Sequence, residues 1–199
     1  MTLLPPTFVR ACVYCGSRHG QRRGYVQAAR QLGEAIGRRG WQLVYGGGHV
    51  GLMGEVADAT LAAGGTVVGV ITEALLKREV GHRGLTELHV VRTMHERKQA
   101  MAERADLFVA LPGGIGTMEE LFEVWTWRQL GYHDQPIGLL DVEGYYQPFL
   151  ALCRQMVDEG FLAADQAASL TVDTDAERLL LGLARRTCRS ERPDDYSRI

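Results

Sequence analysis

Lysine is scarce in this sequence of 199 residues. Of its 22 basic residues only Lys77 and Lys98 are lysines, and neither lies in the sequence context of a cofactor-binding lysine. Enzymes that decarboxylate amino acids with pyridoxal phosphate need a Schiff-base lysine, so that class is excluded. Excess charge is also lacking, because 24 acidic residues leave a net charge of −2. This balance excludes the broad positive field that attracts nucleic acids or anionic membranes.

Disulfide and metal-binding patterns are missing as well. Four cysteines, Cys12, Cys15, Cys153 and Cys188, do not make the framework of a disulfide-rich secreted protein in a chain of this length. Cys12 and Cys15 form a CxxC pair, but it falls on an expected strand and has no second pair to complete a zinc site. We interpret the thiols as packed side chains in a reducing cytoplasm. The six histidines contain no HExxH motif, so we expect neither a metal nor a cofactor.

Two kinds of hydrophobic segment are absent. Residues 1–10 contain Pro5 and Pro6 and lack the basic start and long apolar core of a signal peptide. No apolar run approaches the ~18 residues that a membrane-spanning helix needs. We therefore expect a cytoplasmic protein that contacts neither membranes nor nucleic acids.

The length and composition predict one globular domain. With 46% hydrophobic residues, the chain can bury a large core without disulfides or structural metal. Short apolar runs alternate with helical patterns, which is typical of βαβ units, and the runs are apolar throughout. We therefore expect a doubly wound α/β domain of the Rossmann-like type, with a mostly parallel sheet and helices on both faces. It occupies residues 1–187, and residues 188–199 form a polar, frayed C-terminal tail.

The expected elements define where a ligand would bind. Strands are expected at residues 8–14, 42–45, 66–71, 87–91, 107–111 and 137–140, with a short one at 170–172. Helices are expected at residues 25–39, 52–63, 95–104, 118–130, 145–159 and 176–186. Ligands of such sheets bind beyond the carboxyl ends of the strands, where each strand turns into a helix.

Three expected strands end in glycine-rich turns that lead into helices. The turns are Tyr14-Cys15-Gly16-Ser17, Gly46-Gly47-Gly48-His49-Val50-Gly51 and Pro112-Gly113-Gly114-Ile115-Gly116-Thr117. Such a turn lets backbone N–H groups approach a phosphate closely, while the helix N-terminus supplies positive potential. Ser17, Gly46, Gly47 and Gly48 are therefore candidate substrate-binding residues. The third turn is the strongest local signal, because an acid follows it within one helical turn.

The second turn also allows a different interpretation. Gly46, Gly48 and Gly51 fit the GxGxxG fingerprint of dinucleotide-binding proteins, and Glu73 could serve as the ribose-binding acid. An NAD-dependent dehydrogenase would follow from this reading. A single GxGxxG motif is equally typical of tight packing between a strand and a helix, so it indicates a cofactor only weakly.

Glu120 has two interpretations. Thr117 and Glu120 have the spacing of a capping box, in which the acid bonds back to the start of its helix. A carboxylate beside a phosphate site is repelled by the phosphate, so a protein that only binds phosphate gains little from one. Facing the sugar, it could instead stabilise an oxocarbenium-like centre and orient water, as carboxylates do in glycoside hydrolysis. The second interpretation is favoured.

Arg97 is equally open to two interpretations. It lies three residues after Met94 and four before Met101, so all three share one helical face, and Thr93 with Glu96 forms a possible capping box at the helix start. Arg97 could lie along the surface with its stem packed and its head in water. It could also be a fixed fork for a phosphate or ribose, with Lys98 adding a point charge.

Four motifs together resemble one known family. They are Gly46–Gly54 (GGGxxGLMG), Glu79-Val80, Met94–Lys98 (MHxRK) and Pro112–Glu120 (PGGxGTxxE). On these residues the sequence strongly resembles the LOG family, the cytokinin riboside 5′-monophosphate phosphoribohydrolases, long labelled possible lysine decarboxylases. The resemblance spans about residues 9–187. It implies a Rossmann-like homodimer that hydrolyses the N-glycosidic bond of a nucleoside 5′-monophosphate, typically with an N6-substituted adenine, releasing free base and ribose 5-phosphate.

The resemblance also implies roles for particular residues. Arg97 and Glu120 match the catalytic pair of the family. The residues that match its nucleotide contacts are Glu79, Lys98, Gly113, Gly114, Ile115, Gly116, Thr117, Met118, Glu119 and Thr126. The core motifs show no departure from the family pattern.

Two further expectations concern turnover and assembly. A non-catalytic nucleotide or cofactor carrier on the same fold is the alternative to a hydrolase, since related folds bind ligands without converting them. The helix at 118–130 carries more apolar residues than one core-facing stripe needs: Leu121, Phe122, Val124, Trp125, Trp127 and Leu130. In agreement with the homodimer that the resemblance implies, we expect part of this helix to meet a second subunit.

Overall fold

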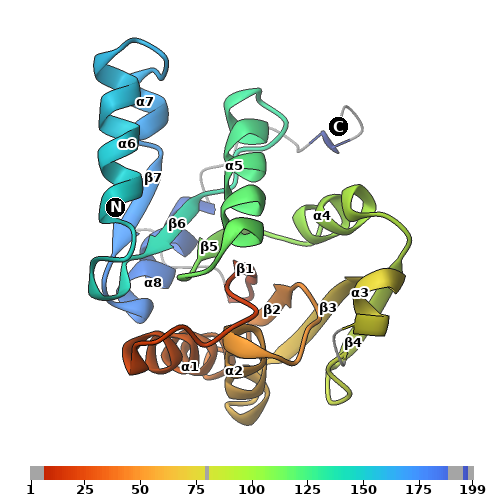
Figure 1. Cartoon of the computed structure of the whole chain (residues 1–199). Helices are drawn as coiled ribbons and strands as arrows, with labels where there is room; N and C mark the ends of the chain where they lie inside the picture. The colour runs from red at the N-terminus through yellow and green to blue at the C-terminus, as the bar shows by residue number, and fades with distance from the viewer. Residues whose placement is uncertain (1–6, 79–80, 188–194, 197–199) are drawn as a thin grey trace.

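The computed structural model describes residues 7–78, 81–187 and 195–196. Its centre is a seven-stranded sheet in the order β4-β3-β2-β1-β5-β6-β7, in which every neighbouring pair is parallel (Figure 1). The strands are β1 (Arg10–Tyr14), β2 (Gln42–Tyr45), β3 (Thr66–Thr72), β4 (Glu87–Val91), β5 (Leu107–Ala110), β6 (Ile137–Leu140) and β7 (Leu170–Asp173). All seven expected strands are present.

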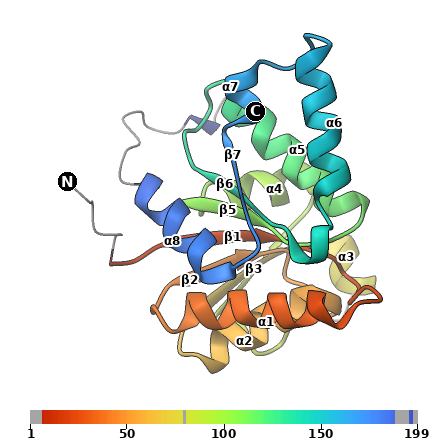
Figure 2. The same cartoon turned by 90° about the vertical axis from the view of Figure 1, so that its left-hand side faces the viewer.

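Helices cover both faces of this sheet. They are α1 (Arg23–Gly37), α2 (Gly51–Ala62), α3 (Glu73–Arg78), α4 (Met94–Ala102), α5 (Ile115–Gln129), α6 (Gln147–Asp158), α7 (Ala164–Ala167) and α8 (Ala176–Thr187), with a 3-10 turn η1 (Val142–Gly144) before α6. Buried residues of α1, α2 and α8 form the core on one face, and those of α4, α5 and α6 form the core on the other (Figure 2). The predicted doubly wound Rossmann-like fold is confirmed.

The two-sided core explains the apolar strands. In β5 and β6 every residue is buried, because the successive side chains point to opposite faces and both faces are covered. β1 lies at the topological switch point, with β2 on one side and β5 on the other. Ligands of open α/β sheets bind beyond the carboxyl ends of the strands at such a point. Within the part of the chain that the structure describes, no helix is long and apolar enough to cross a membrane.

Three features differ from the sequence-based expectations. The short helices α3 and α7 were not predicted, and α5 begins at Ile115 rather than at residue 118. The expected frayed tail is wrong at Asp195 and Tyr196. The backbone N–H of Asp195 donates to the carbonyl of Tyr132, and the Tyr196 ring is buried and stacks on that of His133. An aromatic ring supplies enough apolar area to attach even a polar segment to the core.

Candidate active site

A cavity of about 280 Å³ lies where the segments after β1, β3 and β5 meet α4. Its lining residues are Cys15, Ser17, Met53, Leu75, Met94, Arg97, Gly114, Ile115, Gly116, Thr117, Glu119 and Glu120. Both predicted catalytic residues line it, together with most of the third glycine turn. The topology therefore brings together residues from two motifs that the sequence separates.

A capping box fixes the start of α4, where Arg97 lies. The Thr93 hydroxyl accepts a hydrogen bond from Glu96 N at 3.1 Å, and the Glu96 carboxylate accepts from Thr93 N at 3.2 Å and from Arg92 N at 2.9 Å. These backbone bonds to its ionised form lower the pKa of Glu96 below the usual value. The predicted capping box at Thr93 and Glu96 is confirmed, and it aims the first turn of α4 at the cavity.

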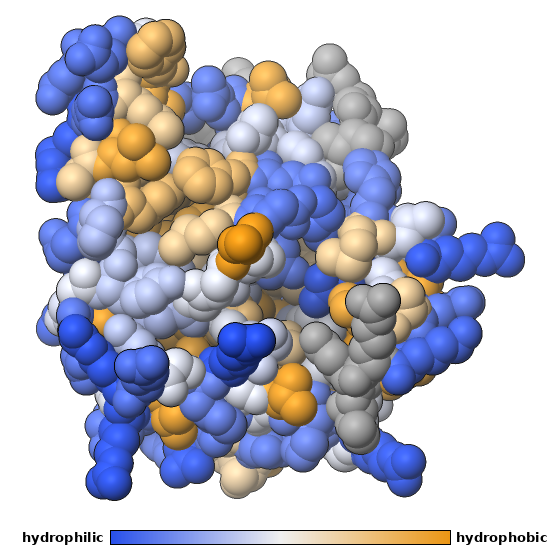
Figure 3. Space-filling model, viewed as in Figure 1, coloured by the Kyte–Doolittle hydropathy of each residue, from blue (hydrophilic) through white to orange (hydrophobic). Residues whose placement is uncertain are grey.

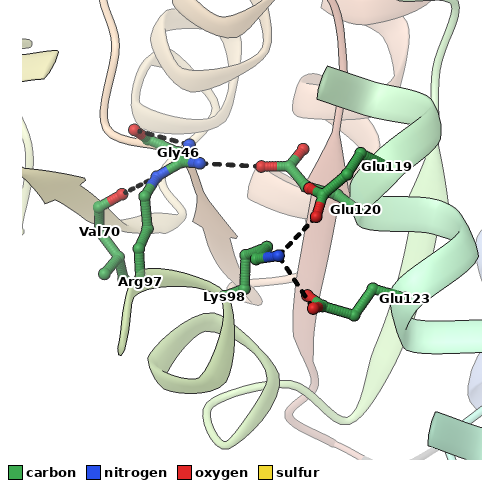
Figure 4. A network of polar contacts seen from close by, with 7 residues as sticks. All are labelled: Gly46, Val70, Arg97, Lys98, Glu119, Glu120 and Glu123. Carbon is green, nitrogen blue, oxygen red and sulfur yellow. Dashed lines mark hydrogen bonds and ion pairs between the residues drawn. The ribbon is translucent and has the colours of Figure 1, made fainter. Parts of the chain in front are cut away.

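Arg97 is a fixed fork that holds parts of the protein together. Its side chain is buried, with the whole residue 6% exposed. The guanidinium donates from Nε to the Val70 carbonyl at 2.9 Å, from Nη2 to the Gly46 carbonyl at 3.3 Å and from Nη1 to Glu120 Oε1 at 3.0 Å (Figure 4). The surface interpretation of Arg97 is therefore wrong. Three of its five N–H donors are bound to protein acceptors, so the fork is rigid.

Gly46 is the site at which this guanidinium fits. A Cβ at Gly46 would overlap Nη2 of Arg97 and would come within 3.5 Å of the Met53 sulfur. The first glycine of the GGG motif thus provides space for a side chain of the protein itself.

Glu120 lies on α5 opposite Arg97. The helix is capped at Gly114 without a side-chain hydrogen bond, and Thr117 is already inside the helix. The capping-box interpretation of Thr117 and Glu120, the less favoured of the two, is therefore wrong, because the Glu120 carboxylate bonds to Arg97 instead of the helix start. Burial raises the pKa of Glu120 above the usual 4.5, while the Arg97 charge and hydrogen bond act in the opposite direction.

Lys98 connects α4 to α5 beside this pair. Its ammonium group lies 2.5 Å from Glu119 Oε1 and 2.9 Å from Glu123 Oε1 (Figure 4). The lysine side chain is only 12% exposed. The two ion pairs of Lys98 thus link α4 to α5. Lys98 does not itself line the cavity.

The third glycine turn is open to solvent. A Cβ at Gly113 would overlap the Thr117 hydroxyl, so this residue must be glycine for the turn to close on its helix. At Gly114 and Gly116, by contrast, an added Cβ would meet no atom within 4 Å. Ile115 between them is 91% exposed. The turn therefore presents backbone and little side chain to the cavity.

The predicted second glycine turn is instead occupied by its own protein. Gly47 has a φ of +75°, and its carbonyl accepts a hydrogen bond from His82 N at 3.3 Å. Gly48 forms a β-bridge with Gly81. Gly46, Gly47 and Gly48 do not line the cavity, whereas Ser17 does.

Four other predicted contacts lie outside the cavity or outside the described chain. Gly113 is one of them, since the lining of this cavity begins at the next residue of the third turn. The Thr126 hydroxyl donates to the Phe122 carbonyl at 2.7 Å, and the residue is exposed about 16 Å along α5 from its first residue. Met118 packs against the core beneath α5. Glu79 lies outside the described residues.

Comparison of the chain with known proteins identifies its family. The family model described as "Possible lysine decarboxylase" matches residues 53–183. The probable cytokinin riboside 5′-monophosphate phosphoribohydrolase LOGL1 of Oryza sativa subsp. japonica is 53% identical over 79% of this chain and 71% of its own length. The cytokinin riboside 5′-monophosphate phosphoribohydrolase LOG of the same species is 49% identical over 88% of this chain and 73% of its own. The chain belongs to the LOG family.

Solved structures agree with the fold of this LOG protein. The molybdenum cofactor carrier protein of Chlamydomonas reinhardtii matches with a TM-score of 0.67, covering 90% of this chain and 98% of its own. The two sequences are 20% identical. At this distance the likeness extends to the fold alone.

A second cavity of the LOG protein went unnoticed in the sequence. It measures about 570 Å³ and shares Ser17, Gly114 and Ile115 with the first cavity. The third glycine turn, called the open turn below, therefore borders both cavities. Tyr25 and Tyr145 also line it. Tyr145 lies in the chain after β6, and its pattern in the sequence is that of an ordinary core aromatic residue.

A cluster of two histidines and an aspartate, which includes His49 of the second glycine turn, has possible ligand atoms for a metal but the wrong histidine tautomer. Ligand atoms of His49, Asp58 and His82 lie within 4.8 Å of one another. Gly84 N donates to Nδ1 of His82 at 3.1 Å, so the ring proton is on Nε2, which lies 2.7 Å from Asp58 Oδ1. A metal at Nε2 would need the proton on Nδ1, against the Gly84 N–H. The pair thus attaches the loop at His82 to α2.

Proposed function

We propose that this LOG protein hydrolyses the N-glycosidic bond of adenosine 5′-monophosphates, including those with a substituted N6 amine, and releases the free base and ribose 5-phosphate. Relatives about half identical over most of the chain are named for this activity. The observation that carries the proposal is the buried pair of Glu120 and Arg97 beside an open glycine turn in one cavity.

The phosphate binds at the open turn. Residues 113–117 present backbone at the N-terminus of α5, where N–H groups without helical partners and the helix dipole favour an anion. Gly114 and Gly116 leave space for phosphate oxygens because neither carries a side chain. Ser17, which lines the cavity from the β1 side, adds a hydroxyl to the same region.

Glu120 acts on the ribose as the catalytic carboxylate. When the glycosidic bond breaks, positive charge develops on the sugar, and a carboxylate close by stabilises it. The glycosidic C–N bond breaks with its electron pair left on the base, which takes up a proton from solvent. The water oxygen bonds to the anomeric carbon and passes one proton to the same carboxylate, which returns it to solvent. Arg97 keeps Glu120 ionised and in place by opposing the effect of burial on its pKa.

A homodimer is the second part of the proposal. Figure 3 shows apolar surface on the face of the molecule that carries α5 and α6. The large apolar side chains exposed on α5, on α6 and just after α6 are Ile115, Phe122, Leu152 and Phe161. Thr126, a nucleotide contact implied by the family, lies on this exposed side of α5 and away from the cavity of its own chain. Both observations support a second subunit here that completes the base end of each site. Light scattering of a fully active sample should give twice the mass of 22.0 kDa, and an active monomer would contradict it.

The enzyme acts in the cytoplasm. Cys12, Cys15 and Cys153 are free, buried thiols. Their reduced state is the one expected of a reducing compartment, which supports this location.

Product analysis tests the function directly. The purified protein is incubated with AMP and with isopentenyladenosine 5′-monophosphate, and free base and ribose 5-phosphate are measured. Adenosine is the control, and its kcat/KM should be much lower because binding energy from the phosphate positions the glycosidic bond. Saturable AMP binding without base release would indicate a carrier instead. Nicotinamide binding in a fluorescence titration would favour a dehydrogenase.

A further inference from the structure

Two consecutive tyrosines brace the segment that leads into the open turn. The Tyr145 hydroxyl donates to the Gly113 carbonyl, and the Tyr146 hydroxyl donates to the Leu111 carbonyl at 2.7 Å. Tyr146 N is itself held by Asp141 Oδ1 at 2.8 Å, directly after β6. The turn after β6 thus supports the turn after β5.

The brace on Gly113 determines the direction of one N–H group. A trans peptide is planar, so its C=O and N–H point in opposite directions. With the Gly113 oxygen held by Tyr145, Gly114 N–H points away from Tyr145. Within the described chain no acceptor receives this N–H. Gly114 lines both cavities, so the group is available to a ligand.

The peptide between these two glycines needs an external support. Glycine adopts positive and negative φ about equally readily, so a peptide flanked by two glycines can flip at little cost. A flip would turn the Gly113 carbonyl, an acceptor, toward the position of Gly114 N–H. For a bound phosphate this would replace a hydrogen-bond donor by a repulsive oxygen.

We propose that Tyr145 is a positioning residue that keeps Gly114 N–H directed at the substrate phosphate. This inference rests on the proposed function, because it assumes an anion at the open turn. Tyr146 provides a comparison within the same turn. Its hydroxyl holds the peptide between Leu111 and Pro112, and proline has no N–H to offer a ligand. Tyr146 therefore supports the fold, whereas Tyr145 supports the phosphate site.

Two phenylalanine variants separate these roles. Tyr145→Phe should raise KM for AMP about tenfold, with little change in kcat, because one fixed hydrogen bond to an anion is lost. Its kcat/KM for adenosine, which has no phosphate, should stay within about twofold of the wild type. Tyr146→Phe should lower the melting temperature and leave KM for AMP unchanged. Tyr45→Phe removes a buried hydroxyl that has no partner among the described residues, and it controls for the loss of a hydroxyl alone.

Calorimetric titration with AMP distinguishes failure of this inference from failure of the proposed function. A wild type that binds AMP without releasing base would overturn the proposed hydrolysis, and the brace would then be judged by the Kd of AMP alone. An unchanged Kd in folded Tyr145→Phe overturns the brace, and so does an equal increase in Tyr146→Phe. A wild type without affinity for AMP overturns both.

Discussion

The turns at the ends of β2 and β5 look alike in sequence and differ in what they face. Both are glycine-rich, and both lead from a buried strand into a helix. The turn at Gly46 is filled from within by the Arg97 guanidinium, and Gly48 pairs with Gly81. The turn at Gly114 and Gly116 has open space where side chains would be.

This difference teaches that a glycine motif indicates that another group can approach the backbone closely. The motif does not tell whether that group is a side chain of the same protein or a ligand. Gly46 admits a side chain from a segment 51 residues away, and its carbonyl becomes an acceptor for that side chain. Gly114 and Gly116 leave the backbone accessible from outside. One turn therefore organises the catalytic pair, and the other is available to the substrate.

The largest effect is expected at Glu120, which lies on the helix that follows the open turn and bonds to the guanidinium that fills the other turn. Glu120→Gln retains an oxygen for Arg97 but removes the negative charge, so kcat should fall about 10²–10⁴-fold. Glu123→Gln is the matched control, since Glu123 lies on the same helix and pairs with Lys98 but does not line the cavity. Its kcat should remain close to that of the wild type. Comparable losses in both variants would remove Glu120 from its catalytic role.

The filled turn should be the more sensitive one to an added methyl group. In Gly46→Ala the new Cβ must displace the Arg97 guanidinium, so unfolding should become easier by about 1–3 kcal/mol. Activity should fall as well, because Glu120 loses its fixed partner. Chemical denaturation and steady-state kinetics measure the two effects. An alanine tolerated in both would mean that the fork of Arg97 is not required.

A pH profile tests whether the burial of Glu120 matters. Because its pKa is raised, kcat should decline as pH falls through a value above the usual 4.5, when the carboxylate takes up a proton. The raised pKa means that the folded state binds this proton more tightly than the unfolded state. Glu120 therefore contributes less to stability as pH rises through that value. An acid limb at or below 4.5 would contradict the assignment.

The smallest effect is expected at the open turn. In Gly116→Ala the added Cβ meets no atom within 4 Å, so the free energy of unfolding should change by less than about 0.5 kcal/mol. The melting temperature should therefore match that of the wild type. KM for AMP should rise moderately, because a methyl group now stands where the phosphate approaches. If Gly116→Ala destabilises the fold as strongly as Gly46→Ala, the distinction between the turns fails.

Much of the fold was predictable from local pattern. The strands at 42–45, 87–91 and 137–140 match the expected bounds at both ends, because apolar runs bounded by turn residues identify buried strands. The helices α3 and α7, with six and four residues, are too short to show a helical period. The burial of Tyr196 was not predicted, because a single aromatic residue in an otherwise polar segment gives no hydrophobic pattern.

The site was only partly predictable, because its decisive contacts join distant segments. The sequence identified Arg97, Glu120 and the open turn as candidates. It assigned Glu120 to a local capping box as one alternative, since the partner 23 residues earlier was not visible. The brace from Tyr145 to Gly113 spans 32 residues and has no sequence signature at all. Local spacing predicts caps and turns, whereas packing decides which groups meet.

The central position of β1 has a consequence for how the chain is made. Ala11 pairs with Leu43 on one side and with Leu107 on the other. During synthesis, one edge of the first strand therefore remains unpaired until more than half of the chain has left the ribosome. Open strand edges are prone to pair with other chains. Nascent chains truncated before β5 should accordingly depend on chaperones for solubility, and chains that include β5 should depend on them less.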